Sequence, residues 1–288
     1  MLENETQTLI QMALKEDCPS TDITCQSLCL SNTPIEAKII AKEPGIFFGH
    51  DVALMIRNAV DTTLNVTCHV QDGAAIANQQ TLLSLSGPSL SLLRAERVLL
   101  NFLQRLCGIA TTTHQYVQAL NNPNIAILDT RKTTPGLRHL EKQAVVAGGG
   151  KNHRHSLSDM MLIKENHLRA LSMEGRLNDL ETCLIAHKKS HPLIPTEVEV
   201  ETLDQIRTFP LHLVDYVMFD NFTPDMIKEG VTLLKARNIQ AEIEISGGVT
   251  LDTLPLYRIL PIHRISIGAL THSVKALDLS LLANDTVY

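Results

Sequence analysis

The chain has 288 residues, 44% of them hydrophobic, and its formal net charge is −6 at neutral pH. That length and composition suit an ordinary globular protein with one large or two moderate domains. An acidic balance, a pI near 6.0 and an aromatic content of 3% argue against a nucleic-acid-binding protein.

The sequence carries no run of eighteen apolar residues, which is the length that a membrane-spanning helix needs. Its N-terminal stretch MLENETQTLIQMALKED is acidic and amphipathic, whereas a signal peptide begins with basic and then apolar residues. The six cysteines are scattered without a CxxC pair, so we expect them to be reduced. We therefore expect a cytoplasmic protein with no membrane partner and no nucleic-acid partner.

Two kinds of periodicity divide the first 120 residues. Apolar residues at helical spacing from Leu2 to Leu14 predict an amphipathic helix that ends before Pro19. Alternating apolar and polar residues then predict strands of a sheet. A long helical region follows from Leu90 to about Leu120, with Gly108 as a break. The expected strands are 35–42, 64–70 and 81–85.

From Ile125 onward, short apolar runs each end on a polar residue or a glycine. Helical patterns lie between most of these runs, at 174–189, 224–237 and 250–259. Alternation of strands and helices predicts parallel strands with helical crossovers, and six strands predict an incomplete barrel. In such folds the functional residues lie at the carboxyl ends of the strands. The six runs are 125–128, 160–163, 198–200, 216–219, 243–245 and 265–267.

Positive charge is concentrated between Arg131 and His155, against the acidic background of the chain. Six lysines and arginines lie there with three histidines and one acid, interleaved with glycine and proline. The segment lacks the residues of a P-loop, because Val145 and Asn152 stand where glycine and serine or threonine are needed. It also lacks a dinucleotide fingerprint, because His153 replaces the last glycine. We interpret this segment as a pocket for a small anion.

The motifs of this segment carry a family resemblance. DTRKTTPGLR at 129–138, GGGKNHR at 148–154 and LIKENH at 162–167 resemble, in order and spacing, the quinolinate phosphoribosyltransferases. Further matching motifs precede and follow them, so the resemblance covers nearly the whole chain. These are DIT at 22–24, AERVLLNFLQRLCGIATTT at 95–113, EVEVE at 197–201, MFDN at 218–221, SGGV at 246–249 and ISIGALTHS at 265–273.

The resemblance implies an α/β protein with two domains. Residues 1–115 would form an N-terminal α/β sandwich with the linking helix, and residues of about 274–288 would pack back on it. Residues 116–273 would form an incomplete, six-stranded α/β barrel of the type II phosphoribosyltransferase kind, which carries the active site. This expectation agrees with the strand count made from the residues alone.

The implied reaction belongs to de novo NAD biosynthesis. Quinolinate and phosphoribosyl pyrophosphate would give nicotinate mononucleotide, pyrophosphate and carbon dioxide. At the matching positions, Arg131, His153 and Arg154 would hold the quinolinate carboxylates, joined by Arg97 from the neighbouring subunit of a homodimer or a dimer-based hexamer. Lys132 and Lys164 would serve the pyrophosphate and the charge near the ring.

Two carboxylates complete the expected catalytic group of Lys132, Lys164, Glu201 and Asp220. Glu201 and Asp220 end neighbouring strands, and their oxygens suit Mg²⁺ that accompanies phosphoribosyl pyrophosphate. They could also bind the ribose hydroxyls directly. The residues leave open which glutamate of EVEVE faces inward, and the family pattern favours Glu201.

Glycine-rich strand ends are expected to bind the 5-phosphate of the ribose. Ser246, Gly247 and Gly248 follow one predicted strand and Gly268 follows the next, as in the phosphate loops near the last strands of many barrels. Two glycines alone would indicate only a turn.

Three other functions remain open at this point. A phosphoribosyltransferase of the same fold that acts on nicotinate would share the phosphate site but release no carbon dioxide. A phosphate-binding barrel isomerase or aldolase would form an imine at Lys164 that borohydride can trap. A non-enzymatic protein that binds anionic metabolites would bind both ligands and release no pyrophosphate.

Overall fold

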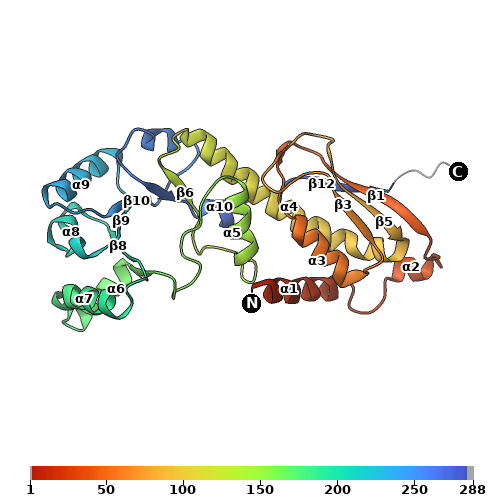
Figure 1. Cartoon of the computed structure of the whole chain (residues 1–288), viewed down its shortest axis with the longest axis horizontal. Helices are drawn as coiled ribbons and strands as arrows, with labels where there is room; N and C mark the ends of the chain where they lie inside the picture. The colour runs from red at the N-terminus through yellow and green to blue at the C-terminus, as the bar shows by residue number, and fades with distance from the viewer. Residues whose placement is uncertain (1, 284–288) are drawn as a thin grey trace. The chain divides into compact units, whose positions relative to one another are not determined.

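The computed structural model describes residues 2–283, which form two compact units (Figure 1). The first unit contains the chain up to His114, Lys132–Gly150 and the segment from Ala269 onward. The second contains Gln115–Arg131 and Lys151–Gly268. The expected division assigns 132–150 and 269–273 to the barrel domain, whereas here both segments lie with the first unit. No helix among the described residues is both long enough and apolar enough to cross a membrane.

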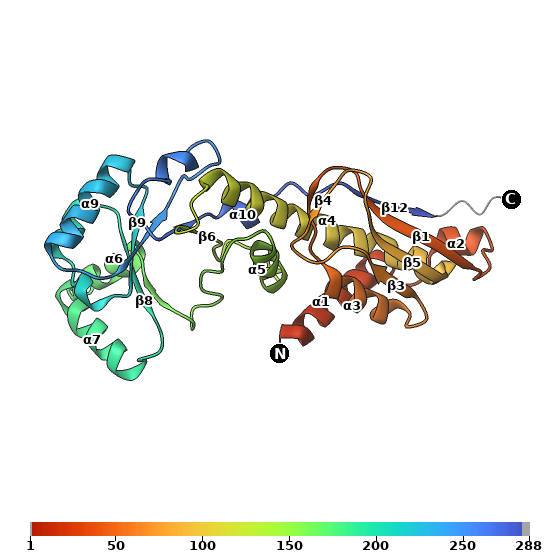
Figure 2. The same cartoon turned by 45° about the horizontal axis from the view of Figure 1, so that its top comes forward.

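An antiparallel sheet forms the centre of the first unit. Its strand order is β12-β1-β5-β3, and β12 pairs with β1, so the chain returns to this unit at its C-terminal end. Figure 2 shows α4 extending along the sheet. Residues 284–288 of the segment expected to pack here lie outside the described residues. The elements are α1 (Leu2–Asp17), α2 (Ile23–Ser27), β1 (Pro34–Ala41), β2 (Gly45–Ile46), α3 (His50–Val60), β3 (Asn65–Cys68), β4 (Ala75–Ile76), β5 (Thr81–Pro88), α4 (Ser89–Leu120), α5 (Arg138–Ala147), α10 (Ala269–His272) and β12 (Leu279–Ala283).

The helix α4 is continuous, so the expected break at Gly108 is wrong. A side chain at this position would place its Cβ 2.4 Å from the backbone oxygen of Lys275. The glycine therefore lets the C-terminal segment approach the helix closely. Packing of this kind outweighs the low helix propensity of one glycine, which costs about 1 kcal/mol.

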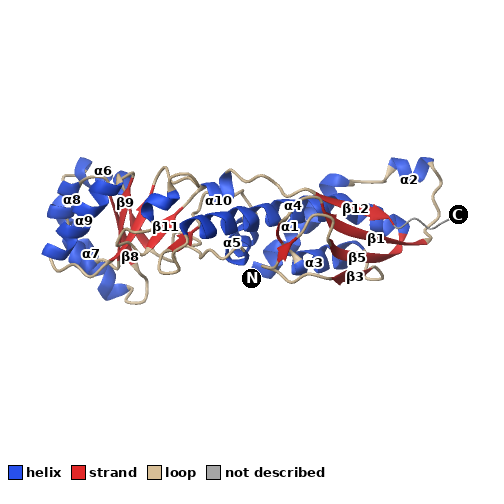
Figure 3. Cartoon of the chain, turned by 90° about the horizontal axis from the view of Figure 1, so that it is seen from above, coloured by secondary structure: helices blue, strands red, loops and turns tan. Residues whose placement is uncertain are grey.

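The second unit is built on a parallel sheet of six strands, in the order β6-β11-β10-β9-β8-β7. All six expected strands are confirmed within one or two residues. Figures 1 and 3 show α6, α7, α8 and α9 packed around this sheet. The elements are β6 (Ala126–Leu128), β7 (Met161–Ile163), α6 (Glu165–Met173), α7 (Leu180–Ser190), β8 (Thr196–Val200), α8 (Leu203–Thr208), β9 (Tyr216–Asp220), α9 (Pro224–Ala236), β10 (Glu242–Ser246) and β11 (Arg264–Ser266).

Two of the expected helices differ in the structure. The pattern at 174–189 forms an α-helix only from Leu180, after a short 3-10 helix at Leu177–Asp179, because α6 ends at Met173 and Gly175 adopts a φ of 70°. The pattern at 250–259 forms only a short 3-10 helix at Leu254–Tyr257, which begins next to Pro255. The expected helix at 224–237 is confirmed as α9.

Candidate active site

Polar residues and glycines lie at one edge of the six-stranded sheet. The pairing of β6, β11, β10, β9, β8 and β7 is parallel throughout, so the carboxyl ends of all six strands meet at the same edge. Each strand contributes one such residue, which lies near its carboxyl end or at most two residues beyond it. These residues are Asp129, Lys164, Glu199, Asp220, Ser246 and Gly268.

Lys164 and Glu199 form a salt bridge across β7 and β8. Lys164 comes directly after β7, and the side chain of Glu199 is almost fully buried within β8. Glu201 lies in the exposed turn beyond β8, where its backbone N–H donates to the side chain of Gln205 at 2.6 Å. Of the three glutamates, Glu199 is therefore the one that reaches Lys164, and the role expected for Glu201 stays a prediction.

Three acidic side chains influence one another around Lys164. Burial raises the pKa of Glu199, and the hydrogen bond with Glu165 and the charge of Asp220 add to this effect, while Lys164 opposes it. Asp220 is half-buried and accepts a hydrogen bond from the side chain of Asn221 at 2.7 Å. The site thus holds Glu199 and Asp220 close enough to repel, beside one lysine.

The loop after β10 packs against the end of β9. The backbone N–H of Asn221 donates to the carbonyl of Ser246 at 2.9 Å. Gly247 has a φ of 89°, and a Cβ there would lie 2.2 Å from Oδ1 of Asn221. Gly248 also has a positive φ of 63°, but a Cβ there would meet no described atom closer than 4.0 Å. Only glycine therefore fits at Gly247, and its absent side chain leaves the backbone accessible.

Two arginines expected to bind carboxylates lie near each other. Arg154 is buried, and its Nη1 donates to the carbonyl of Met160 at 3.1 Å. Burial lowers the pKa of Arg154, and the positive charge of Arg131 lowers it further. Within the described residues Arg154 forms no salt bridge. The charges of Glu197 and Asp159 act on the pKa of Arg154 in the opposite direction. Two neighbouring guanidinium groups favour an anionic ligand, because its negative charge reduces their mutual repulsion.

A buried cluster of four ionisable residues lies under these groups, and analysis of the sequence missed most of it. Nε2 of His153 is 3.0 Å from Oε2 of Glu197 and 3.5 Å from Oε1 of Glu244. Arg264 contacts Glu197 at 2.9 Å and Glu244 at 2.6 Å, and its guanidinium lies 3.4 Å from the centre of the Tyr216 ring. The inward alternation of EVEVE was the only signal for this cluster in the sequence.

The pKa values of the two glutamates of this cluster shift in opposite directions. Burial raises the pKa of Glu197, but the hydrogen bond with His153 and the charge of Arg264 outweigh it, so the pKa lies below its usual value. Burial and the charge of Glu197 raise the pKa of Glu244 well above its usual value. The hydrogen bond with His153 and the charge of Arg264 therefore favour the ionised form of Glu197, whereas burial favours the neutral form of Glu244.

His153, Glu197 and Glu244 form a group that could hold a metal ion, since their ligand atoms lie within 4.8 Å of one another. The guanidinium of Arg264 already contacts both carboxylates. Arg264 therefore already supplies positive charge to both carboxylates, through the oxygens that do not face His153.

Two predicted site residues belong to the first unit. Arg97 is exposed on α4, and Lys132 is exposed before α5. The backbone carbonyl of Lys132 accepts a hydrogen bond from Thr271 at 2.7 Å. Gly148 and Gly150 of the GGGK motif pack against Ala110 and Thr113 of α4, so both serve close packing within this unit.

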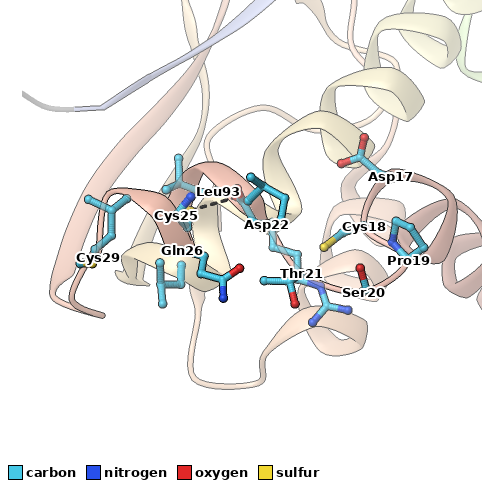
Figure 4. Close-up of a pocket in the computed structure, with 14 residues that line it drawn as sticks. Asp17, Cys18, Pro19, Ser20, Thr21, Asp22, Cys25, Gln26, Cys29 and Leu93 are labelled. Carbon is cyan, nitrogen blue, oxygen red and sulfur yellow. Dashed lines mark hydrogen bonds between the residues drawn. The ribbon is translucent and has the colours of Figure 1, made fainter.

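The DIT motif lies in the first unit and caps a helix. Asp22 precedes α2 and accepts hydrogen bonds from the backbone N–H of Cys25 at 3.0 Å and from its thiol at 2.9 Å. The hydrogen bond with Asp22 raises the pKa of Cys25. A pocket of about 670 Å³ opens beside this cap and is lined also by Cys18, Leu93 and Arg94 (Figure 4).

Comparison with known proteins agrees with this arrangement. Residues 22–107 match the N-terminal domain of quinolinate phosphoribosyl transferases, and residues 109–282 match the C-terminal domain. A probable nicotinate-nucleotide pyrophosphorylase [carboxylating] of Bacillus subtilis is 41% identical over 98% of this chain and 96% of its own. The nicotinate-nucleotide pyrophosphorylase of Francisella tularensis superposes with a TM-score of 0.87, at 33% identity, over 98% of this chain and 96% of its own. NadC from Streptococcus pyogenes has a TM-score of 0.86 at 36% identity, over 96% of this chain and 98% of its own. With both of its domains matched, the chain belongs to the quinolinate phosphoribosyltransferase family.

Proposed function

We propose that the chain transfers the phosphoribosyl group of phosphoribosyl pyrophosphate to quinolinate and releases pyrophosphate and carbon dioxide, giving nicotinate mononucleotide for NAD biosynthesis. The observation that carries this proposal is the pairing of two chemistries at one edge of the sheet. Arg131 and Arg154 provide positive charge for a dicarboxylate, and the ends of β9 and β10 provide carboxylate and glycine groups for a phosphorylated sugar.

The arginines suit quinolinate because a guanidinium can donate to both oxygens of a carboxylate. Arg154 is held by the carbonyl of Met160, so part of its conformational freedom is lost before a ligand binds. A ligand with two adjacent carboxylates can satisfy both guanidinium groups. Nicotinate, which has one carboxylate, would contact fewer guanidinium groups and should bind less tightly.

Phosphoribosyl pyrophosphate would bind to groups at the same edge of the sheet. Gly247 and Gly248 let the backbone approach the 5-phosphate closely, and Gly268 follows the neighbouring strand. Lys164 is placed to stabilise the negative charge of the departing pyrophosphate, with Lys132 as a second predicted contributor. Glu199 and Asp220 are suited to the ribose hydroxyls, which can donate hydrogen bonds to carboxylates.

The carboxylates also fit the Mg²⁺ ion that accompanies phosphoribosyl pyrophosphate. Glu199 and Asp220 offer hard oxygen ligands and repel each other, as the effect of Asp220 on the pKa of Glu199 indicates. A bound Mg²⁺ would neutralise charge on the pyrophosphate. Glu201 remains a predicted ligand that could reach the ion only from the exposed turn.

The protein's contribution to the reaction is orientation and charge neutralisation. The arginines would hold the ring so that its nitrogen faces C1 of the ribose. The nitrogen forms a bond to C1 while the bond from C1 to the pyrophosphate oxygen breaks. The pyridinium then accepts the electron pair of the bond to the adjacent carboxylate, which leaves as carbon dioxide, and a proton replaces it on the ring carbon.

Incubation of the protein with quinolinate, phosphoribosyl pyrophosphate and Mg²⁺ tests this function directly. Nicotinate mononucleotide and carbon dioxide should form in equal amounts, and excess chelator should abolish both. Equal use of nicotinate would favour a phosphoribosyltransferase without decarboxylation. Trapping of an imine at Lys164 by borohydride would favour the aldolase alternative.

We also infer a cytoplasmic homodimer in which Arg97 joins the neighbouring subunit's site. The exposure of Arg97 on α4 is compatible with such a contact. The scattered, free cysteines support the location. Sedimentation of the purified protein tests whether it is a dimer, and fractionation of cells tests whether it is cytoplasmic.

A further inference from the structure

Both nitrogen atoms of the His153 ring are engaged by groups of the protein. The backbone N–H of Arg154 donates to Nδ1 at 2.8 Å, and Nε2 lies 3.0 Å from Oε2 of Glu197. A nitrogen that accepts a hydrogen bond carries no proton, so the ring proton is on Nε2 and is donated to Glu197. A neutral ring in this tautomer has no N–H left to donate to a substrate carboxylate.

The backbone around His153 is anchored as firmly as the ring. The N–H of His153 donates to Oδ1 of Asp129 at 2.9 Å, and Asp129 is fully buried directly after β6. The N–H of Lys151 donates to the carbonyl of Ile127 at 2.8 Å, and the N–H of Asp129 donates to the carbonyl of Lys151 at 3.2 Å. The segment 151–153 therefore continues the sheet beside β6.

The acceptor of the ring proton is itself held in place. Oε1 of Glu197 accepts from Nη2 of Arg264 at 2.9 Å, while Oε2 faces His153. Arg264 stacks on the ring of Tyr216. Glu197, Tyr216 and Arg264 lie on three different strands of the sheet. Rotation of the Glu197 carboxylate would break a buried contact on each side, so the carboxylate keeps the His153 ring in one orientation.

We propose that His153 is a positioning residue, held by Glu197, that fixes the backbone of Arg154 and thereby the direction of its guanidinium. The carboxylate of quinolinate then contacts Arg154 and not the His153 ring. The carbonyl of Met160 restrains the far end of the same side chain. This inference rests on the proposed function, because it takes the ligand of Arg154 to be a quinolinate carboxylate.

The tautomer of His153 can be measured on the ligand-free protein. The full chain labelled with ¹⁵N-histidine should show, for His153, one pyridine-type and one pyrrole-type ring nitrogen, and the His153→Asn variant identifies the signals by their loss. The pattern should not change when quinolinate is added. Two pyrrole-type nitrogens, or exchange of the proton between the nitrogens on addition of quinolinate, would overturn the proposal.

Two substitutions separate positioning from direct contact. Asn at this position keeps an oxygen that can accept the Arg154 N–H, whereas His153→Phe keeps the shape of the ring without an acceptor. Calorimetry with quinolinate alone should give His153→Asn a Kd within about threefold of the parent's, and His153→Phe a Kd about tenfold higher or more. Equal weakening in both variants, or no weakening in either, contradicts the positioning role.

Two controls keep the outcome interpretable. Two measurements show whether each variant keeps the fold: its binding of phosphoribosyl pyrophosphate and its thermal unfolding midpoint. If His153→Phe does not fold, the ¹⁵N spectrum of the parent protein alone tests the proposal. A parent protein that binds no quinolinate would contradict the proposed function itself. The spectrum of the ligand-free parent tests the inference independently of that result.

Discussion

At the scale of single residues, the unusual feature is how many acids lie inside the parallel sheet. Glu197, Glu199 and Glu244 are buried on β8 and β10, where an unpaired charge would be strongly destabilising. Each of them contacts a cation, Lys164 or Arg264. The chain keeps these carboxylates at defined positions, at the cost of burying charge, which is common where a site must be preorganised.

The neighbouring glutamates allow a matched test of the carboxylate beside Lys164. Glu199→Gln should lower kcat/KM for phosphoribosyl pyrophosphate by roughly ten- to a hundredfold, because a charge-assisted hydrogen bond of about 1.5 to 3 kcal/mol is lost. Glu201→Gln changes an exposed turn and should alter the same constant by about twofold or less. Initial rates at saturating quinolinate measure both effects. If Glu201→Gln lowered kcat/KM more than Glu199→Gln, the catalytic carboxylate would be Glu201.

At the scale of elements, the parallel sheet explains why distant residues form one site. Adjacent strands bring Asp220 and Ser246 into register, and the hydrogen bond from Asn221 joins the loops that follow β9 and β10. Loops alone would not hold these groups so closely. The sheet provides the rigid part of the site, and the glycines determine how closely the loop backbone can approach a ligand.

Substitution of Gly247 and Gly248, in the loop after β10, should have different effects on activity. Gly247→Ala combines a positive φ with a contact at 2.2 Å to Asn221, so it should displace the loop and raise the KM for phosphoribosyl pyrophosphate by about tenfold. Gly248→Ala has the same kind of backbone strain but space for a methyl group, and its effect should be smaller. A larger effect at Gly248 would show that ligand contact, not packing on Asn221, governs this loop.

At the scale of the whole molecule, the chain is made of two compact units. The segment Lys132–Gly150 belongs with the first unit, although the chain on either side of it belongs to the second. The expected exchange of Arg97 between subunits would make the dimer, and not the single chain, the catalytic unit.

Mixing of two inactive variants tests this exchange. Arg97→Ala and Arg131→Ala proteins, unfolded and refolded together in equal amounts, should form mixed dimers in half of the cases. In each mixed dimer one site keeps both arginines, so about a quarter of the parental activity should return. Sedimentation and tagged subunits confirm that exchange took place. Activity that stays at the background of the separate variants would place Arg97 outside a shared site.

The sequence by itself determined the alternating strands and helices of the second unit, the six strand ends and the family. Those features depend on local periodicity and on short motifs, which the linear chain displays directly. It could not decide whether Gly108 ends a helix, because the contact that favours glycine there comes from Lys275, far along the chain.

Only the tertiary structure decided which glutamate of EVEVE meets a cation. Residues 197, 199 and 201 alternate onto one face in an extended strand, so periodicity treats them alike. The strand ends at Val200, which leaves Glu201 in solvent, while Arg264 and Lys164 approach the other two from separate strands. Contacts between strands distant in sequence set these partners, and no local pattern encodes them.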